Sequence, residues 1–208
     1  MASDVDICRA ALAALGTRQT ITSIDEKSTE ARACKAWYDL TLDGLQRSAD
    51  FNFTRRKVAL AQVDEDAPDG WRYSYSVPAQ CLKVHVLSAS MITYIPPVND
   101  AIKQLKIIPV DYEVAAVDSG GRIYCNLSPV YCVFAQRVTT VDSWDVGFRN
   151  AMVMSLAAAI AFPITQKSSI ATVLAQKAKD ALSEALASDG NEANQNYMEH
   201  VPDWIAAR

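Results

Sequence analysis

A cysteine and a histidine stand four residues apart in a stretch where apolar and polar residues alternate. Positions four apart share a face of an extended strand, so Cys81 and His85 would point the same way. Such a pair could bind a metal ion, or combine a thiol nucleophile with a base. A zinc site needs further ligands, and a nucleophilic pair needs a third group that orients the base. The sequence shows neither, so a small metal- or Cys-dependent hydrolase is kept as an alternative interpretation.

Carboxylates gather in a second stretch, which contains Asp64, Glu65, Asp66 and Asp69. They could bind calcium, but the EF-hand spacing and its closing glutamate are missing, which favours a solvated loop. Residues 119–121 include two glycines between two predicted strands, and this indicates a hairpin rather than a phosphate-binding loop. The chain has no nucleophile elbow, P-loop or dinucleotide-binding motif. We therefore expect a protein that is not an enzyme, with no catalytic residue, metal or cofactor.

The charge balance bears on nucleic-acid binding. The net charge is −4 and the isoelectric point is about 5.2. DNA-reading domains usually carry a basic stripe, whereas the densest basic run here is the short Arg55-Arg56-Lys57. An accessory DNA-binding protein is thus a second alternative, which the acidity disfavours. A mildly acidic protein surface would let DNA slide past it without binding tightly.

The cysteines and the apolar runs indicate where the protein is made. There are five cysteines and no CxxC motif. Cys8 and Cys34 fall on apolar helical stripes and Cys132 lies in an apolar strand, which predicts buried, reduced thiols and synthesis in a reducing cytoplasm. No basic region followed by an apolar run opens the chain, so no signal peptide is expected. The longest apolar run, residues 151–162, is too short for about 30 Å of hydrocarbon, so we expect a buried helix and no membrane partner.

Apolar residues at three- and four-residue steps predict two helices near the start of the chain. Ser3 and Asp6 form a capping pair for the first, which ends at Gly16. The second begins between Ser23 and Ser28, where two caps compete. Its predicted buried side comprises Cys34, Tyr38, Leu42, Leu45 and Ala49, widened by Trp37 and Leu40. Gly44, inside this helix, would permit a close helix crossing.

Helical periodicity returns after residue 141. A third helix is expected from Asp142 or Ser143 to about Phe162, where Pro163 breaks it. A fourth runs from residue 165 or 168 to about Ser188, before the breaker sequence at 189–191. Between residues 53 and 138 the period is two instead, and no helical pattern separates the runs, which predicts an antiparallel sheet.

The predicted fold class is therefore α+β: a bundle of about four helices from both chain ends, with an inserted antiparallel β-sheet lobe. The expected boundaries are 1–52 and 141–190 for the helical bundle, 53–140 for the β lobe and 191–208 for an extended C-terminal tail. The tail shows no convincing period, yet it carries Tyr197, Val201, Trp204 and Ile205. Apolar residues of this kind usually dock on something, and both a partner subunit and the chain's own surface are open.

Several short motifs follow one another in a specific order. They are Glu30-Ala-Arg-Ala-Cys34 with Trp37-Tyr38; Asp50-Phe-Asn-Phe53 with Arg55-Arg56; Trp71-Arg-Tyr-Ser-Tyr75 with Val77-Pro78; Tyr112-Glu-Val114 with Gly120-Gly121; and Phe148 with Leu156-Ala157-Ala158. This series, across roughly residues 5 to 190, resembles the tail tubular protein A family of short-tailed phages, which are head-to-tail adaptors or gatekeepers. The family often has tryptophan where Phe51 stands, and an aromatic-Asp-Pro opening where this chain has Trp144-Asp145-Val146.

The resemblance implies a structural virion protein of the tail or neck, assembled in the host cytoplasm. Such adaptors form a ring, of twelve copies in the family, between the portal protein and the tail nozzle protein. DNA passes through the lumen of the ring without sequence-specific binding. Similar adaptors place their helical part on the portal and their sheet part toward the nozzle. The resemblance does not cover the tail beyond Asn191, but the aromatic and branched residues of the tail suggest that the portal contacts lie at Tyr197, Val201, Trp204 and Ile205.

Overall fold

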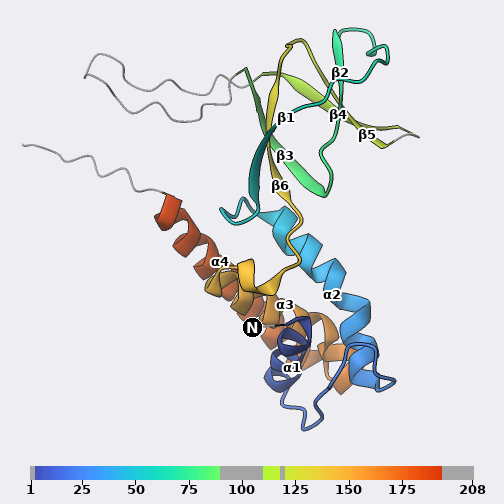
Figure 1. The fold of residues 1–208 in the computed structure, drawn as a ribbon. Helices are drawn as coiled ribbons and strands as arrows, with labels where there is room; N and C mark the ends of the chain where they lie inside the picture. The colour runs from blue at the N-terminus through green and yellow to red at the C-terminus, as the bar shows by residue number, and fades with distance from the viewer. Residues whose placement is uncertain (1–2, 90–109, 118–119, 194–208) are drawn as a thin grey trace, which may run out of the picture.

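The computed structural model describes residues 3–89, 110–117 and 120–193, and it has two lobes (Figure 1). The helical lobe combines both ends of the described chain. Its helices are α1 (Asp4–Ala14), α2 (Thr29–Ser48), α3 (Val146–Thr165) and α4 (Ser168–Ala193). All the strands lie in the segment between α2 and α3. The predicted α+β fold, with a β lobe inserted into a helical bundle, is confirmed.

The β lobe consists of two small antiparallel sheets. One has the strand order β1-β6-β3, with β1 (Arg55–Ala59), β3 (Cys81–Ser88) and β6 (Tyr131–Gln136). The other has the order β2-β5-β4, with β2 (Tyr73–Ser76), β4 (Tyr112–Val117) and β5 (Gly120–Cys125). Tyr75 and Ile123 from one sheet share a buried apolar cluster with Leu87 and Phe134 from the other. The two sheets therefore enclose a core of their own.

The predicted hairpin near residue 120 joins β4 to β5. Val117 pairs with Gly120, and Gly120 has a φ of 118°, a conformation that glycine adopts without strain. The next glycine, Gly121, has a different reason to lack a side chain. A Cβ atom there would lie 2.7 Å from Cγ2 of Val77.

The core of the helical lobe is built around α3, which packs against α1, α2 and α4. Three aromatic rings mark the place where the chain returns from the β lobe. Phe148 lies edge-on to Phe51 and Trp144, with ring centroids 5.0 and 5.3 Å apart. The indole N–H of Trp144 donates to the carbonyl of Val138 at 2.9 Å, which fixes the segment after β6 against this core.

Side-chain hydrogen bonds cap the N-terminal ends of the first two helices. Ser3 and Asp6 form the predicted capping box of α1. Of the two possible caps at the start of α2, Ser28 is the one that the structure shows. Its hydroxyl accepts a hydrogen bond from the backbone N–H of Ala31 at 3.3 Å. Glu26 accepts from the backbone of Thr22 instead and so helps to order the preceding turn.

The expected ends of α3 were wrong. A short 3₁₀ turn, η1 (Val141–Ser143), comes first, and Asp145 rather than Asp142 or Ser143 caps α3. Pro163 does not break the helix, which continues to Thr165. A proline at this position removes one backbone hydrogen bond to the carbonyl four residues earlier, and the packing of α3 against α4 outweighs the loss.

The expected end of α4 was also wrong, because the helix continues past Ser188 to Ala193. Residues 191–193 are therefore helical rather than part of an extended tail. Asp189 anchors this last part: its carboxylate accepts from the backbone N–H of Asn52 at 3.1 Å, and the Asn52 amide donates to its carbonyl at 2.9 Å. A contact 137 residues away in the chain thus overrides the local breaker sequence.

Among the described residues, α3 is the one helix whose length and apolar composition would allow it to cross a membrane. Its contacts give those apolar residues another role. Phe148, Met152, Leu156 and Ile160 are fully buried against the neighbouring helices. The apolar run is accounted for as the central helix of the lobe.

Candidate functional site

The structure places the Cys81 and His85 pair on β3, where register shifts interrupt the regular alternation of side chains. No hydrogen bond joins the two residues in the part of the chain that the structure describes. Burial raises the pKa of the Cys81 thiol, which disfavours the reactive thiolate. Within the described ranges, no group of three or more histidine, cysteine or acidic side chains could hold a metal ion. The described residues therefore contain no assembled site that would support the hydrolase interpretation.

His85 faces an acidic partner at the boundary between the lobes. Its Nε2 lies 3.3 Å from Oδ1 of Asp50, within ion-pairing range, but the geometry makes no hydrogen bond. Asp50 also accepts from Arg55 at 2.6 Å. Burial lowers the pKa of His85, and this effect outweighs the opposite influence of Asp50. The folded protein therefore favours a neutral imidazole.

The basic run Arg55-Arg56-Lys57 has two exposed arginines and a half-buried lysine. The run lies on β1, an edge strand, where Arg55 forms an ion pair with Asp50. The Lys57 ammonium nitrogen is buried without a hydrogen-bond partner among the described residues, and burial lowers its pKa. Arg56 stays an exposed cation, so the run offers a short contact, rather than a basic stripe, to a phosphate backbone.

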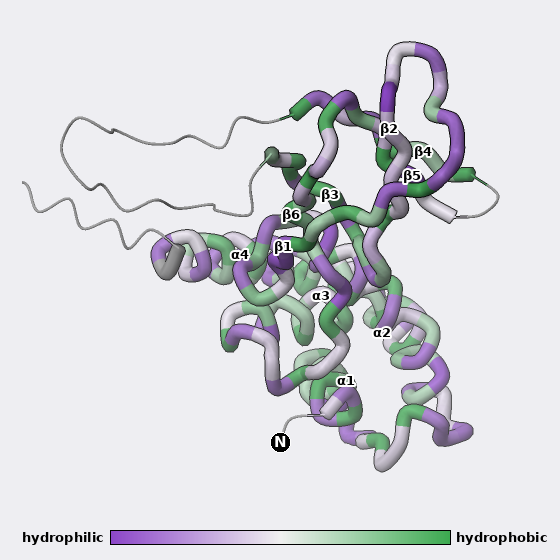
Figure 2. Tube along the Cα trace, turned by 45° about the horizontal axis from the view of Figure 1, so that its top comes forward, coloured by the Kyte–Doolittle hydropathy of each residue, from purple (hydrophilic) through white to green (hydrophobic). Residues whose placement is uncertain are grey.

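The acidic stretch before β2 forms a hydrophilic loop (Figure 2). One carboxylate in it has a structural role, because Glu65 accepts from the guanidinium of Arg122 at 2.9 Å. Arg122 lies on the neighbouring strand β5 and its side chain is largely buried. The contact ties the loop to the sheet and matches the expectation of a solvated loop.

Polar contacts from α2 hold the two lobes together, and we call this region the lobe junction. Arg137, just after β6, donates to Asp39 and Asp43 of α2. Gln46 makes a reciprocal pair with the backbone of Val138, donating to its carbonyl at 2.7 Å and accepting from its N–H at 2.9 Å. Each lobe has a separate apolar core. Hydrogen bonds and ion pairs, rather than a continuous apolar core, therefore connect the lobes at the junction.

One face of α2 is apolar and uncovered. Trp37 and Leu40 were expected to widen the buried side, but they are 41% and 67% exposed. They point away from the buried Tyr38 and Leu42, because α3 and α1 cover only the other side of the helix. Ala33, Trp37, Leu40 and Gly44 follow one another at helical spacing, and we call them the α2 outer face.

Gly44 was expected to allow a close helix crossing, and this prediction was wrong for the described chain. A Cβ atom at this position would meet nothing within 4 Å. Trp37 and Leu40 on the same face are exposed, whereas Ala33 packs partly against the helical core. A flat, small-residue end beside Trp37 and Leu40 leaves room for another molecule to approach.

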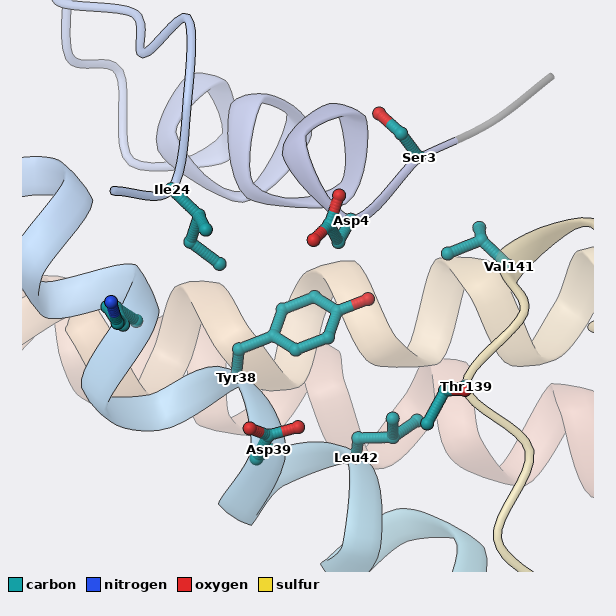
Figure 3. Close-up of a pocket in the computed structure, with 9 residues that line it drawn as sticks. Ser3, Asp4, Ile24, Tyr38, Asp39, Leu42, Thr139 and Val141 are labelled. Carbon is teal, nitrogen blue, oxygen red and sulfur yellow. The ribbon is translucent and has the colours of Figure 1, made fainter. Parts of the chain in front are cut away.

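A groove of about 440 Å³ opens on the opposite side of α2, between the start of α1 and the segment that follows β6 (Figure 3). We call it the Tyr38 groove. Its lining residues are Ser3, Asp4, Ile24, Lys35, Tyr38, Asp39, Leu42, Thr139 and Val141. Three of them are aliphatic, and the polar ones include carboxylates from both α1 and α2. The combination suits a ligand that is part apolar and part charged.

Tyr38 is the most unusual residue of this groove. It is only 8% exposed, and its buried hydroxyl has no hydrogen-bond partner in the part of the chain that the structure describes. Burial raises the pKa of Tyr38, and the carboxylates of Asp4 and Asp39 act in the same direction. A buried hydroxyl without a partner is costly, so its presence in a groove calls for an explanation.

The sequence did not reveal the Tyr38 groove, because three segments far apart in the chain form it. Tyr38 was correctly placed on the buried side of its helix, but an apolar stripe gives no sign that a hydroxyl lacks a partner. The predicted portal contacts, Tyr197, Val201, Trp204 and Ile205, lie outside the described residues.

No model of a known family matches the sequence, and neither does any curated protein.

Proposed function

We propose that this protein is a head-to-tail adaptor of a short-tailed phage, a structural virion subunit that forms a ring between the portal and the tail nozzle. The ordered series of motifs supports the proposal. The two-lobe architecture supports it as well, because an adaptor needs two chemically different ends. In this proposal the helical lobe faces the portal, the β lobe faces the nozzle and DNA passes through the lumen.

The observation that carries the proposal is the α2 outer face. An exposed tryptophan and leucine next to small residues are typical of a surface that another protein covers. In both Figures 1 and 2, α2 and α4 lie on either side of α3. A ring needs a head-to-tail contact, in which one side of each subunit meets a different side of the next. The α2 outer face is proposed as one of these two sides, in a ring of twelve copies.

The portal contact is proposed at the C-terminal tail. Tyr197, Val201, Trp204 and Ile205 provide aromatic and branched anchors, and burying one such anchor can contribute about 2 kcal/mol or more at an interface. Because α4 extends to Ala193, the appropriate deletion removes residues 194–208. The truncated chain should keep its far-ultraviolet circular dichroism and lose binding to the portal of the same phage. Unchanged binding would exclude the tail as the portal contact.

Assembly is proposed to depend on the portal, since rings formed too early would obstruct morphogenesis. The isolated protein should then be monomeric or weakly associated in light scattering at micromolar concentration. Stable dodecamers without portal would contradict this part of the proposal. Replacing Leu40 by glutamate should abolish ring formation on the portal while leaving the monomer folded, because Leu40 makes little contact within the chain.

A further inference from the structure

We propose that the Tyr38 groove is a binding site for an arginine side chain of a protein partner. Under the proposed function that partner is the portal, and in this respect the inference rests on the proposed function. The groove itself can be tested without any portal. Three features carry the inference: a buried hydroxyl without a partner, aliphatic walls and uncompensated negative charge.

The hydroxyl of Tyr38 requires a hydrogen-bonding group from outside the described chain. Figure 3 shows it directed toward the space between Asp4 on α1 and Val141 beyond β6. The hydroxyl oxygen can accept a hydrogen bond from an N–H group, and the Asp4 carboxylate can accept others. Asp4 is exposed and can be reached directly, whereas the Tyr38 hydroxyl is enclosed, so a donor reaches it only when the residues around it move apart.

The walls of the groove suit a long side chain with an apolar stem. Ile24, Leu42 and Val141 line it, and the ring of Tyr38 lies among them (Figure 3). Arginine and lysine bury their methylene stems along apolar surface while the charged end seeks polar partners. A cation can also lie against the face of an aromatic ring.

The electrostatic balance around the groove favours a cation. Asp39 is paired with Arg137 at 2.6 Å, and Lys35 is paired with Asp25 at 2.6 Å. Counted with Asp43, which shares Arg137, and Asp4, the groove and its immediate partners hold four carboxylates against two cations, or two net negative charges. Asp4 forms no ion pair within the described ranges, and its carboxylate accepts a hydrogen bond from the neighbouring Val5 N–H at 2.8 Å. It is the carboxylate available to an incoming cation.

Arginine fits these acceptors better than lysine. Its planar guanidinium presents several N–H donors in fixed directions and can bind a carboxylate and a hydroxyl at the same time. It is also more weakly hydrated than an ammonium group, so placing it in a half-enclosed groove costs less. We therefore expect the partner to present an exposed arginine flanked by apolar residues.

The test uses the full chain and two synthetic peptides that differ in one side chain. The probe is acetyl-Gly-Leu-Arg-Leu-Gly-amide, and its neutral counterpart has glutamine in place of arginine. Binding is followed by NMR titration of the protein. The arginine peptide should bind saturably and about tenfold more tightly than the glutamine peptide. Equal affinity of the two peptides, or no saturable binding, overturns the inference.

Two variants and a matched control locate the binding. Asp4→Asn should weaken the arginine peptide about tenfold, and Tyr38→Phe should weaken it about threefold by removing one acceptor. Asp180→Asn removes a carboxylate on α4 that accepts a hydrogen bond from Gln176, and it should leave the affinity for the arginine peptide unchanged. Thermal melting of each variant verifies that it is folded. Equal affinity of wild type and both groove variants would place the peptide elsewhere and overturn the inference.

Competition with the portal distinguishes this inference from the proposed function. A saturating amount of the arginine peptide should weaken portal binding about tenfold, whereas the glutamine peptide should not. Portal binding that is indifferent to the arginine peptide would overturn the portal as the partner of the groove. If the chain does not bind its portal at all, the proposed function fails, and the peptide titration alone tests whether the Tyr38 groove binds arginine.

Discussion

The guanidinium of Arg137, just after the last strand of the β lobe, lies 2.6 Å from the carboxylate of Asp39 in the middle of α2. The same group also donates to Asp43, one helical turn further on. The two residues of this contact are 98 positions apart in the chain. Because the lobes have separate apolar cores, contacts of this kind set the position of one lobe relative to the other.

Removing the arginine should weaken the lobe junction without disturbing either core. In Arg137→Met, the free energy of unfolding should fall by about 1 kcal/mol, a modest value because these ion pairs are partly exposed. Urea denaturation measures the change. Arg56→Met is the matched control, because Arg56 donates only to nearby backbone carbonyls, and it should have a smaller effect. Equal losses in the two variants would contradict the role of the junction.

Two leucines on α2 provide a direct test of which side of the helix is covered. Leu42 is fully buried, so Leu42→Ala should lower the free energy of unfolding by about 2–5 kcal/mol. Leu40 is 67% exposed, and Leu40→Ala should change it by less than about 0.5 kcal/mol. Chemical denaturation of the isolated chain compares them. A large loss from Leu40→Ala would show that the α2 outer face is covered within a single chain.

Two glycines should respond in opposite directions to alanine. In Gly147→Ala the new Cβ would lie 3.1 Å from the Cα of Ala185 on α4, so α3 and α4 must shift, at a cost of about 1–3 kcal/mol. In Gly44→Ala nothing is within 4 Å, and the helix should gain about 0.5–1 kcal/mol. Thermal unfolding followed by circular dichroism measures both. A destabilised Gly44→Ala monomer would contradict the open environment of this position.

His85 should make stability depend on pH. Burial lowers its pKa in the folded state, so the unfolded chain binds more protons in the range just below the ordinary value of 6.5. Stability from this residue is complete above about pH 6.5 and is lost as the pH falls toward the folded-state pKa. Urea denaturation at pH 7.5 and pH 5.5 should show a smaller drop for His85→Gln than for wild type. An identical drop would assign the pH dependence to other groups.

The sequence predicted the elements well wherever local signals and packing agree. The capping box of Ser3 and Asp6 defines the start of α1, and the buried side of α2 follows its apolar stripe. Local signals failed where distant contacts decide the outcome. The breaker sequence after Ser188 is overridden by the contact between Asp189 and Asn52. Pro163 is tolerated because it falls in a final turn that is packed against another helix.

The candidate sites show the same limit. Periodicity cannot tell which apolar residues of a helix stay uncovered, so Trp37 and Leu40 were assigned to the wrong side. The pairing of strands into two sheets depends on contacts such as that of Tyr75 with Ile123, which alternation does not encode. The Tyr38 groove requires α1, α2 and the segment after β6 to meet, and only a three-dimensional structure reveals it.

Electron microscopy of the purified protein mixed with the portal of the same phage tests the proposed ring. The images should show twelve copies attached to one end of the portal, with the helical lobes next to the portal and the β lobes pointing away. Portal particles without an added ring, at concentrations where both proteins are folded, would contradict it.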